Sequence, residues 1–283
     1  MAQAVTLPPS ALGEVNRRAA ERILQARRLV SEQHRAERER CASDVAYWVS
    51  AYCRTYDPRL PAPAIPFALF PRQAEFLGWL EAREQAGHDG LCEKSRDMGV
   101  TWLCVAFAVH RWLWRPGYAA GFGSRKLGLV DELGNLSSIL EKARFILRHL
   151  PAWQLPPGFD LARHAGICKL VHPGTGASIT GEGGDQIGRG GRQSIYFVDE
   201  AAFLEHPESI ERSLSATSNC RIWVSTPNGP GGPFYAKRHG GTVPVFTFHW
   251  RDDPRKSEQW YAEQLRRLDS VTVAQELDIA YSA

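Results

Sequence analysis

The sequence predicts a three-layer α/β fold built on a mostly parallel sheet, preceded by a helical N-terminal extension. Short apolar runs typical of buried strands alternate with longer amphipathic stretches typical of helices. Such an alternation requires crossover connections between parallel strands. The chain has 283 residues, of which 43% are hydrophobic and 23% charged, and this composition excludes a wholly disordered protein.

The N-terminal part of the chain differs from the rest. Residues 11–40 mix both charge signs with strong helix formers, which predicts one exposed helix, either a solvated arm or a helix that docks on a partner. Residues 44–56 carry aromatic side chains at helical spacing and are expected to pack on the body. Four prolines within residues 57–66 exclude a helix interior and indicate a linker. We therefore expect an arm with its linker over residues 1–60 and an α/β domain over residues 61–283.

The α/β domain alternates short apolar runs with longer helical patterns. Strands are expected at residues 90–93, 118–122, 167–171, 178–180, 195–198, 221–225 and 243–248, and helices at residues 72–85, 100–114, 127–149, 207–214 and 257–269. In a parallel sheet, the loops that follow the strands gather at one edge, where ligands bind.

Charge and cysteine content exclude several classes of protein. The net charge of +3 and pI near 8.5 do not establish nucleic-acid binding, but they allow a local basic surface. No apolar run approaches the ~18 residues of a membrane span, and the N-terminus lacks a signal pattern, so we expect no membrane partner. The six cysteines form no CxxC pair, which indicates reduced thiols in a soluble intracellular protein.

A variant phosphate-binding turn is predicted at residues 93–101, EKSRDMGVT. A nucleoside-triphosphate loop, usually GxxxxGK[ST], needs converging backbone N–H groups, a cation for the phosphates and a hydroxyl for Mg²⁺. Gly99 and Thr101 fit the second glycine and the hydroxyl, but valine stands where the lysine is usual. Lys94 at the head of the turn, with Arg96 beside it, is the expected cation. Short basic turns before helices are common, so the turn alone does not establish a nucleotide site.

Two adjacent acids follow a predicted strand. Asp199 and Glu200 end the apolar run at residues 195–198, about 100 residues after the turn. Asp199 is expected to reach Mg²⁺, directly or through water, and Glu200 to orient and deprotonate the attacking water. A helix whose first turn favours acids would explain either acid alone. Together with the turn, the pair favours nucleotide hydrolysis.

Two further stretches extend the predicted site. The run STPNG at residues 225–229 follows another apolar strand and is suited to sensing a γ-phosphate, although an ordinary polar turn has the same composition. Gln73, in the stretch FPRQ, has an amide that can pair with both edges of adenine.

The ordered set FPRQ, KSRDMGVT, IYFVDEAAF and STPNG resembles the ATPase domain of the large terminase subunit of tailed bacteriophages, the motor that packages DNA into procapsids. In that family the lysine habitually stands at the head of the phosphate loop. The resemblance covers roughly residues 44–283 and includes SRK at 124–126 and the closing stretch from residue 249. It implies a P-loop NTPase fold of the ASCE, RecA-like type.

The resemblance also implies roles for individual residues. Lys94 and Arg96 would bind phosphates, Thr101 and Asp199 would hold Mg²⁺, Glu200 would be the catalytic carboxylate and Gln73 would read adenine. The nucleotide site would comprise Gln73, Lys94, Ser95, Arg96, Asp97, Met98, Gly99, Val100 and Thr101, and the coupling motif would comprise Ser225, Thr226, Pro227, Asn228 and Gly229. A neighbouring subunit would supply Arg189 from the glycine-rich stretch 181–191, with Arg192, directly after that stretch, as second choice. A flexible loop with merely solvated arginines remains an alternative.

The implied function is ATP hydrolysis coupled to translocation of double-stranded DNA, with ATP and Mg²⁺ as cofactors. A homo-oligomeric ring on the procapsid, the portal protein and the small terminase subunit are the implied partners, in the host cytoplasm. Candidate DNA contacts are Arg125, Lys126, Arg144, Lys237 and Arg238.

Large terminases usually continue into an RNase H-like nuclease domain, whereas this sequence ends at Ala283. We therefore expect no nuclease activity, and we interpret the Asp252–Asp253 pair before a proline as structural. Two alternatives remain. One is a superfamily-two helicase-like or other nucleic-acid remodelling ATPase, which would need a second RecA-like domain. The other is a scaffold whose ATPase motifs are relics.

Overall fold

The computed structural model describes residues 9–282 and divides into two compact units, Met1–Asp44 and Val45–Ala283. Helix α1 (Pro9–Ser43) forms the first unit and contains the helix predicted over residues 11–40. Residues 45–60, which the sequence assigns to the arm and linker, belong to the second unit.

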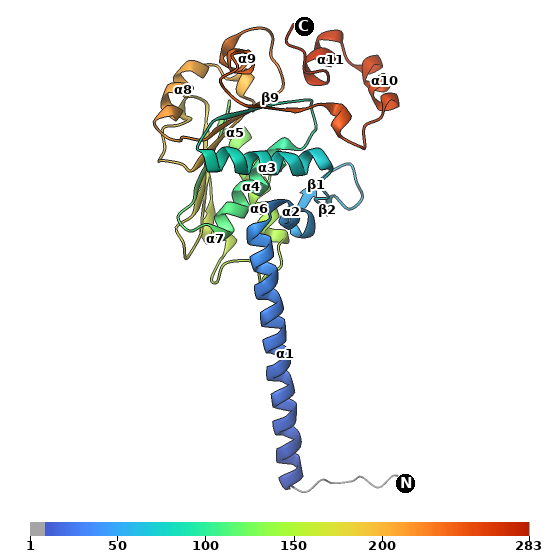
Figure 1. Cartoon of the computed structure of the whole chain (residues 1–283), viewed down its shortest axis with the longest axis vertical. Helices are drawn as coiled ribbons and strands as arrows, with labels where there is room; N and C mark the ends of the chain where they lie inside the picture. The colour runs from blue at the N-terminus through green and yellow to red at the C-terminus, as the bar shows by residue number, and fades with distance from the viewer. Residues whose placement is uncertain (1–8, 283) are drawn as a thin grey trace. The chain divides into compact units, whose positions relative to one another are not determined.

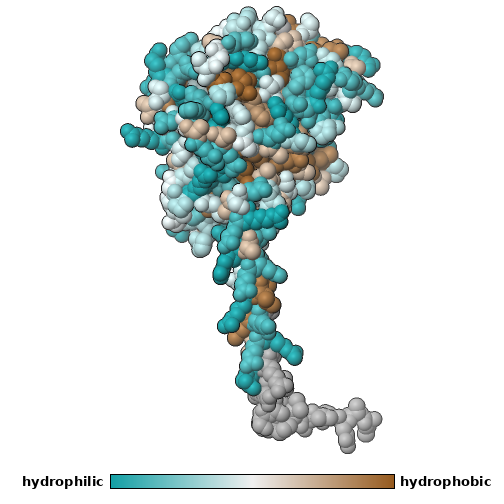
Figure 2. Space-filling view, viewed as in Figure 1, coloured by the Kyte–Doolittle hydropathy of each residue, from teal (hydrophilic) through white to brown (hydrophobic). Residues whose placement is uncertain are grey.

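Several apolar side chains of α1 are exposed. The exposed fractions are 56% for Leu24, 54% for Leu29 and 49% for Val30. Brown apolar atoms interrupt the polar surface of the helix in Figure 2. Either the solvated arm or the docking helix is compatible with this surface. Across the described residues, no helix has the length and apolar character needed to cross a bilayer.

The second unit is built on an eight-stranded sheet in the order β10-β3-β9-β8-β4-β7-β6-β5. Figure 1 labels β9 of this sheet and the helices of the same unit. The strands are β3 (Gly90–Lys94), β4 (Ala119–Ser124), β5 (Ala165–Gly166), β6 (Lys169–Val171), β7 (Ser178–Gly183), β8 (Ile195–Asp199), β9 (Arg221–Ser225) and β10 (Val245–Phe248). The six strands from β10 to β7 are parallel, and only β6 and β5 add antiparallel pairs within this sheet. The carboxyl ends of β3, β4, β8 and β9 therefore share one edge.

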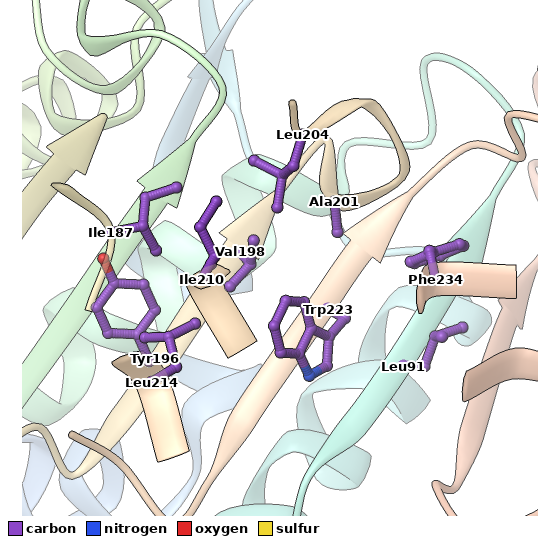
Figure 3. Close-up of a cluster of buried hydrophobic side chains, with 10 residues drawn as sticks. All are labelled: Leu91, Ile187, Tyr196, Val198, Ala201, Leu204, Ile210, Leu214, Trp223 and Phe234. Carbon is purple, nitrogen blue, oxygen red and sulfur yellow. The ribbon is translucent and has the colours of Figure 1, made fainter. Parts of the chain in front are cut away.

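Strand β8 shows why helices cover both faces of the sheet. Successive side chains of a strand point to opposite faces. Phe197 stacks on Phe122 with ring centroids 4.9 Å apart and meets Phe107 of α4 (Val100–Trp114) edge-on. Tyr196 and Val198 belong to the cluster on the other face, drawn in Figure 3.

The helices complete the three layers. On one face, α2 (Val45–Tyr52), α3 (Pro71–Ala86) and α6 (Ile139–His149) pack against α4. On the other face, α8 (Pro207–Ser215) and α9 (Gly232–His239) supply Ile210, Leu214 and Phe234 to the cluster of Figure 3. The predicted three-layer α/β fold is confirmed, although the sequence did not indicate α9.

The single helix predicted over residues 127–149 is wrong. The structure has α5 (Leu127–Val130) and α6, separated by a loop in which Gly134 has φ +80°. Ser138 Oγ donates a hydrogen bond to the carbonyl of Asn135 at 2.8 Å, which favours the loop conformation over a helix. Local side-chain bonds and a left-handed glycine therefore interrupt a run whose apolar spacing looks continuous.

The predicted linker over residues 57–66 is also more ordered than expected. Strand β1 (Arg54–Tyr56) pairs in antiparallel register with β2 (Ala64–Pro66). The intervening turn is held by Asp57, which accepts hydrogen bonds from the N–H and Nε of Arg59 at 3.0 and 2.8 Å. The prolines shape a hairpin rather than a free connection.

The chain after β10 forms a short C-terminal segment. It contains α10 (Glu258–Arg267), which confirms a helix near the predicted range, and α11 (Ser270–Glu276), which was not predicted. Trp250, Val273 and Leu277 form a small buried cluster, so this segment has its own apolar contacts. The short helix α7 (Leu161–His164) precedes β5.

Candidate functional site

The phosphate loop, residues 94–99, connects β3 to α4. Lys94 is the last residue of β3, and Gly99 precedes the helix with φ +74°. Asp97 also has a positive φ of 61°, in a region that aspartate tolerates better than most residues. Alternation between left-handed and other backbone conformations makes a concave nest of N–H groups, which binds anions.

Thr101 and Asp199 meet at the carboxyl edge of the sheet. Thr101 Oγ1 donates a hydrogen bond to Asp199 Oδ2 at 2.9 Å. Burial raises the pKa of the Asp199 carboxyl above its usual range, and the nearby Lys94 ammonium and the Thr101 hydrogen bond oppose that rise. Lys94 therefore acts electrostatically on the carboxylate that it was predicted to face.

These two oxygen donors fit a magnesium site. Mg²⁺ prefers oxygen ligands and is usually held by one or two protein groups together with phosphate oxygens and water. The hydroxyl of Thr101 and the carboxylate of Asp199 already lie within hydrogen-bond distance of each other. Within residues 9–282, no group of three or more His, Cys, Asp and Glu side chains has the geometry of a metal cage.

Glu200 is paired with an arginine that the sequence did not assign to the site. Glu200 has a positive φ of 54°, and its Oε2 accepts a hydrogen bond from Arg125 Nε at 2.8 Å. Both side chains are a little over 40% exposed, so the carboxylate remains accessible to solvent. Arg125 follows β4 at the same edge of the sheet, and that position was the available signal for its role.

A cavity of about 410 Å³ lies at this site, although neither Thr101 nor Asp199 is among its lining residues. It is lined by Lys94, Arg96, Arg125, Glu200, Phe203, Ser225, Thr226 and Glu276. The head of the phosphate loop, the second acid and the start of the STPNG run therefore face one space. Three cationic and two carboxylate side chains line it, which suits binding of a polyanion beside a general base.

The STPNG run is bonded to the segment directly after Glu200. Ser225 Oγ accepts a hydrogen bond from the N–H of Ala202 at 3.2 Å, and Asn228 Nδ2 donates to the carbonyl of Ala202 at 3.0 Å. Thr226 Oγ1 donates to Glu276 Oε1 at 3.2 Å. A shift of this run would therefore be transmitted to the backbone that carries Glu200.

Gln73 is buried against the phosphate loop. Its Nε2 donates to the carbonyl of Met98 at 3.1 Å, and its Oε1 accepts from the N–H of Phe70 at 3.4 Å. Only 3% of the residue is exposed. Both ends of the amide bind backbone here, and adenine recognition by Gln73 stays a prediction.

Ser95 is directed into the protein. Its N–H donates to the carbonyl of Phe248 at 2.8 Å, and its Oγ donates to the carbonyl of Leu277 and accepts from the N–H of Trp250. The residue is completely buried. Ser95 thus attaches the C-terminal segment to the phosphate loop, a contact that its position in the motif did not suggest. Val100 and Met98 are also buried, whereas Arg96 and Asp97 are exposed.

Arg189 and Arg192 are exposed in the segment between β7 and β8. The stretch at residues 181–191 is only partly a loop, because β7 continues to Gly183. A Cβ at Gly183 would lie 2.4 Å from the backbone nitrogen of Leu127, so this glycine permits a close approach of chains. Neither arginine lines the cavity of Lys94 and Glu200. Their action on a neighbouring subunit stays a prediction.

Two other groups of predicted residues have structural contacts. Arg144 is wrong as a DNA contact, because it is buried and donates from both terminal nitrogens to Asp131, at 2.6 and 2.7 Å. Asp252 accepts from the N–H of His249 at 2.8 Å, and Asp253 binds the N–H and guanidinium of Arg255. These contacts agree with a structural role for the acid pair.

Comparison with solved structures finds the same fold in phage large terminases. The Thermus phage P74-26 large terminase ATPase domain is 19% identical, with a TM-score of 0.53 over 69% of this chain and 88% of that chain. The large terminase of a thermophilic bacteriophage in complex with ADP is 17% identical, with a TM-score of 0.55 over 76% of this chain and 54% of that chain. The HK97 bacteriophage large terminase is 14% identical, with a TM-score of 0.58 over 84% and 54%.

This chain thus spans about half the length of the ADP-bound terminase and of the HK97 protein. No family model and no curated protein matches the sequence. The chain has the P-loop NTPase fold of terminase ATPase domains.

Proposed function

We propose that this chain is the ATP-hydrolysing motor domain of a viral large terminase, which drives double-stranded DNA into a procapsid. One observation supports this most: Lys94, Glu200 and the first residues of STPNG line the same cavity. Thr101 is bonded to Asp199, the residue directly before Glu200. The solved terminase of the thermophilic bacteriophage, with ADP bound, has the same fold, which supports a nucleotide as the ligand.

Each side chain has a distinct task in this proposal. Lys94 binds the β- and γ-phosphates from the head of the loop, and the N–H groups of the nest bind their oxygens. Thr101 and Asp199 would hold Mg²⁺, which would neutralise charge developing on the phosphates. Glu200 orients the attacking water and accepts its proton.

Arg125 positions Glu200 before nucleotide enters. The 2.8 Å bond from its Nε holds the carboxylate at the mouth of the cavity. A γ-phosphate competes for the same guanidinium, because arginine binds phosphate oxygens in the geometry with which it binds carboxylates. Release of Glu200 from Arg125 would then free the carboxylate to act on water.

Movement is coupled to hydrolysis through STPNG. Ser225 and Asn228 both bind the backbone of Ala202, two residues after Glu200. A change around Glu200 on loss of the γ-phosphate would therefore reach the STPNG run through these two bonds. The resulting shift would move a DNA-binding surface whose contacts are mainly to phosphates. In this proposal the working form is a ring on the portal, assisted by a small subunit, with Arg189 completing the neighbouring site.

ATP turnover by Glu200→Gln tests the proposal. The amide keeps the size of the side chain but cannot accept the proton, so we expect turnover with Mg²⁺ and DNA to fall at least about 100-fold. Affinity for ATP should remain within a few-fold of the wild-type value. Phosphate release and equilibrium binding of a fluorescent ATP analogue measure the two quantities.

Glu208→Gln is the matched control, because this exposed glutamate lies on α8, outside the cavity. It should hydrolyse ATP at the wild-type rate. Unchanged turnover in Glu200→Gln would remove Glu200 from its assigned role, and absence of turnover in the wild-type protein with DNA and Mg²⁺ would favour the relic scaffold.

A further inference from the structure

A lysine from the C-terminal segment is bonded to the back of the phosphate loop. Lys256 Nζ donates to the carbonyl of Arg96 at 3.0 Å and to the carbonyl of Asp97 at 3.1 Å. It also lies 3.4 Å from the sulfur of Met98. The ammonium thus contacts three consecutive residues of the loop, although Lys256 is about 160 positions away in the sequence.

The carbonyl of Met98, the third of these residues, is held by a different side chain. Gln73 Nε2 donates to the carbonyl of Met98 at 3.1 Å. The carbonyls of Arg96, Asp97 and Met98 are therefore all fixed by side-chain donors from outside the loop. This arrangement determines the orientation of three successive peptide planes.

Because a peptide bond is planar and trans, the C=O of one residue and the N–H of the following residue point in opposite directions. The N–H groups of Asp97, Met98 and Gly99 accordingly point away from Lys256 and Gln73. None of the described residues accepts a hydrogen bond from these three N–H groups. The N–H of Arg96, by contrast, donates to the carbonyl of Glu276 at 2.6 Å, so the free donors begin at Asp97.

The position of Lys256 is itself built by local structure. Its N–H donates to the carbonyl of Asp253 at 2.9 Å, and the buried carboxylate of Asp253 binds Arg255. The ammonium also lies 5.1 Å from the centre of the Trp260 ring. Burial lowers the pKa of Lys256, whereas the charges of Asp97 and Asp253 oppose that change and favour the ammonium form.

We propose that Lys256 is a positioning residue of the nucleotide site, which holds the loop carbonyls outward so that the N–H groups of Asp97 and Met98 face the phosphates. Its relevance to ATP rests on the proposed function, whereas its effect on the loop does not. The buried Asp253 acts one step further back, because it shapes the turn that presents Lys256.

The test compares Lys256→Met with Arg251→Met in the full chain. Methionine keeps an unbranched side chain and removes the cation. Arg251 is a matched control, since it lies in the same segment and stacks on Trp250 at 4.4 Å, but its guanidinium pairs with Glu258 instead of the loop. Lys256→Arg is the conservative variant, because it keeps a cation with several hydrogen-bond donors at this position.

Amide hydrogen exchange without nucleotide is the first readout. In Lys256→Met, exchange of the N–H groups of Ser95 and Arg96 should rise at least about tenfold. These two are bonded to the carbonyls of Phe248 and Glu276, and loss of the bonds from Lys256 loosens the loop that carries them. Peptides of the central strands should exchange as in the wild type. Arg251→Met should leave the loop unchanged, and Lys256→Arg should recover part of the protection.

Affinity for ATP is the second readout. Lys256→Met should raise the KM for ATP about tenfold while kcat changes less than threefold, because the loop binds phosphates in both the ground and the transition state. Unchanged exchange at the N–H groups of Ser95 and Arg96 would overturn the inference, whether or not the protein binds ATP. Increased exchange throughout the sheet would also overturn it, since that result indicates a general structural role. Failure of the wild-type protein to bind ATP would instead reject the proposed function and leave the exchange result decisive for Lys256.

Discussion

At the scale of single residues, the carboxyl edge of the sheet combines two carboxylates in different environments. Asp199 is bonded to Thr101, and burial raises its pKa. Glu200 is partly exposed and bonded to Arg125. A buried acid beside a hydroxyl suits a metal ligand, and an accessible acid suits a base, which supports the separate roles that we propose for these adjacent residues.

Thr101→Ala should raise the Mg²⁺ concentration for half-maximal ATP turnover by roughly tenfold or more, since loss of one oxygen partner weakens a metal site by that order. Thr101→Ser retains the hydroxyl and should stay within about threefold of the wild type. Titration of turnover with Mg²⁺ at saturating ATP measures the change. Equal Mg²⁺ requirements in all three proteins would show that the hydroxyl does not contribute to the metal site.

The sequence predicted some of these residues and missed others for a physical reason. Lys94, Thr101 and Asp199 lie in motifs whose spacing is local, so their chemistry can be read along the chain. Arg125 and Lys256 contact segments about 75 and 160 residues away. Only the parallel register of the sheet and the folding back of the C-terminal segment bring them to the site.

At the scale of elements, α6 is tied to the preceding loop by a buried charge network. Arg144 binds Asp131 and Glu141, and it also donates to the carbonyls of Ala165 and Gly166. All three charged side chains are at most 5% exposed. The same loop breaks the helix predicted over residues 127–149, because a hydrophobic pattern does not show that Asp131 leaves the helix to bind an arginine.

Arg144→Met should destabilise the protein by about 3–5 kcal/mol, because it leaves the buried carboxylate of Asp131 without its cation and leaves Glu141 with Arg148 alone. Chemical denaturation measures the free energy of unfolding. DNA affinity per folded molecule should be unchanged, since the side chain is buried. A stable Arg144→Met protein with weakened DNA binding would return this residue to the DNA interface.

At the scale of the whole molecule, the compact unit begins at Val45. Helix α2 contributes the buried Trp48, whose Nε1 donates to Gln154 Oε1 at 2.9 Å. The boundary at residue 60 was drawn from the prolines, which mark a change in backbone conformation but do not reveal whether the preceding helix is packed. The alternation of strand-like and helix-like runs reflects burial directly, and it therefore predicted the three layers of the α/β domain.

Residues 45–283 produced alone should unfold cooperatively, since the sheet and its clusters lie within this range. Residues 61–283 should be less stable by at least about 3 kcal/mol, because loss of Trp48 alone removes a large buried side chain. Thermal and urea unfolding compare the two proteins. Equal stability would place the boundary at residue 60 after all.

The central claim is that Lys94, at the head of the phosphate loop, binds the triphosphate opposite Thr101 and Asp199. The most direct measurement is the Kd of Mg–ATP for Lys94→Ala, compared with the wild type and with Lys169→Ala, which removes an exposed lysine from β6. We predict roughly 10- to 100-fold weaker binding for Lys94→Ala, the expected loss for charge-assisted bonds to phosphate, and no change for Lys169→Ala. Wild-type affinity in Lys94→Ala would contradict the account.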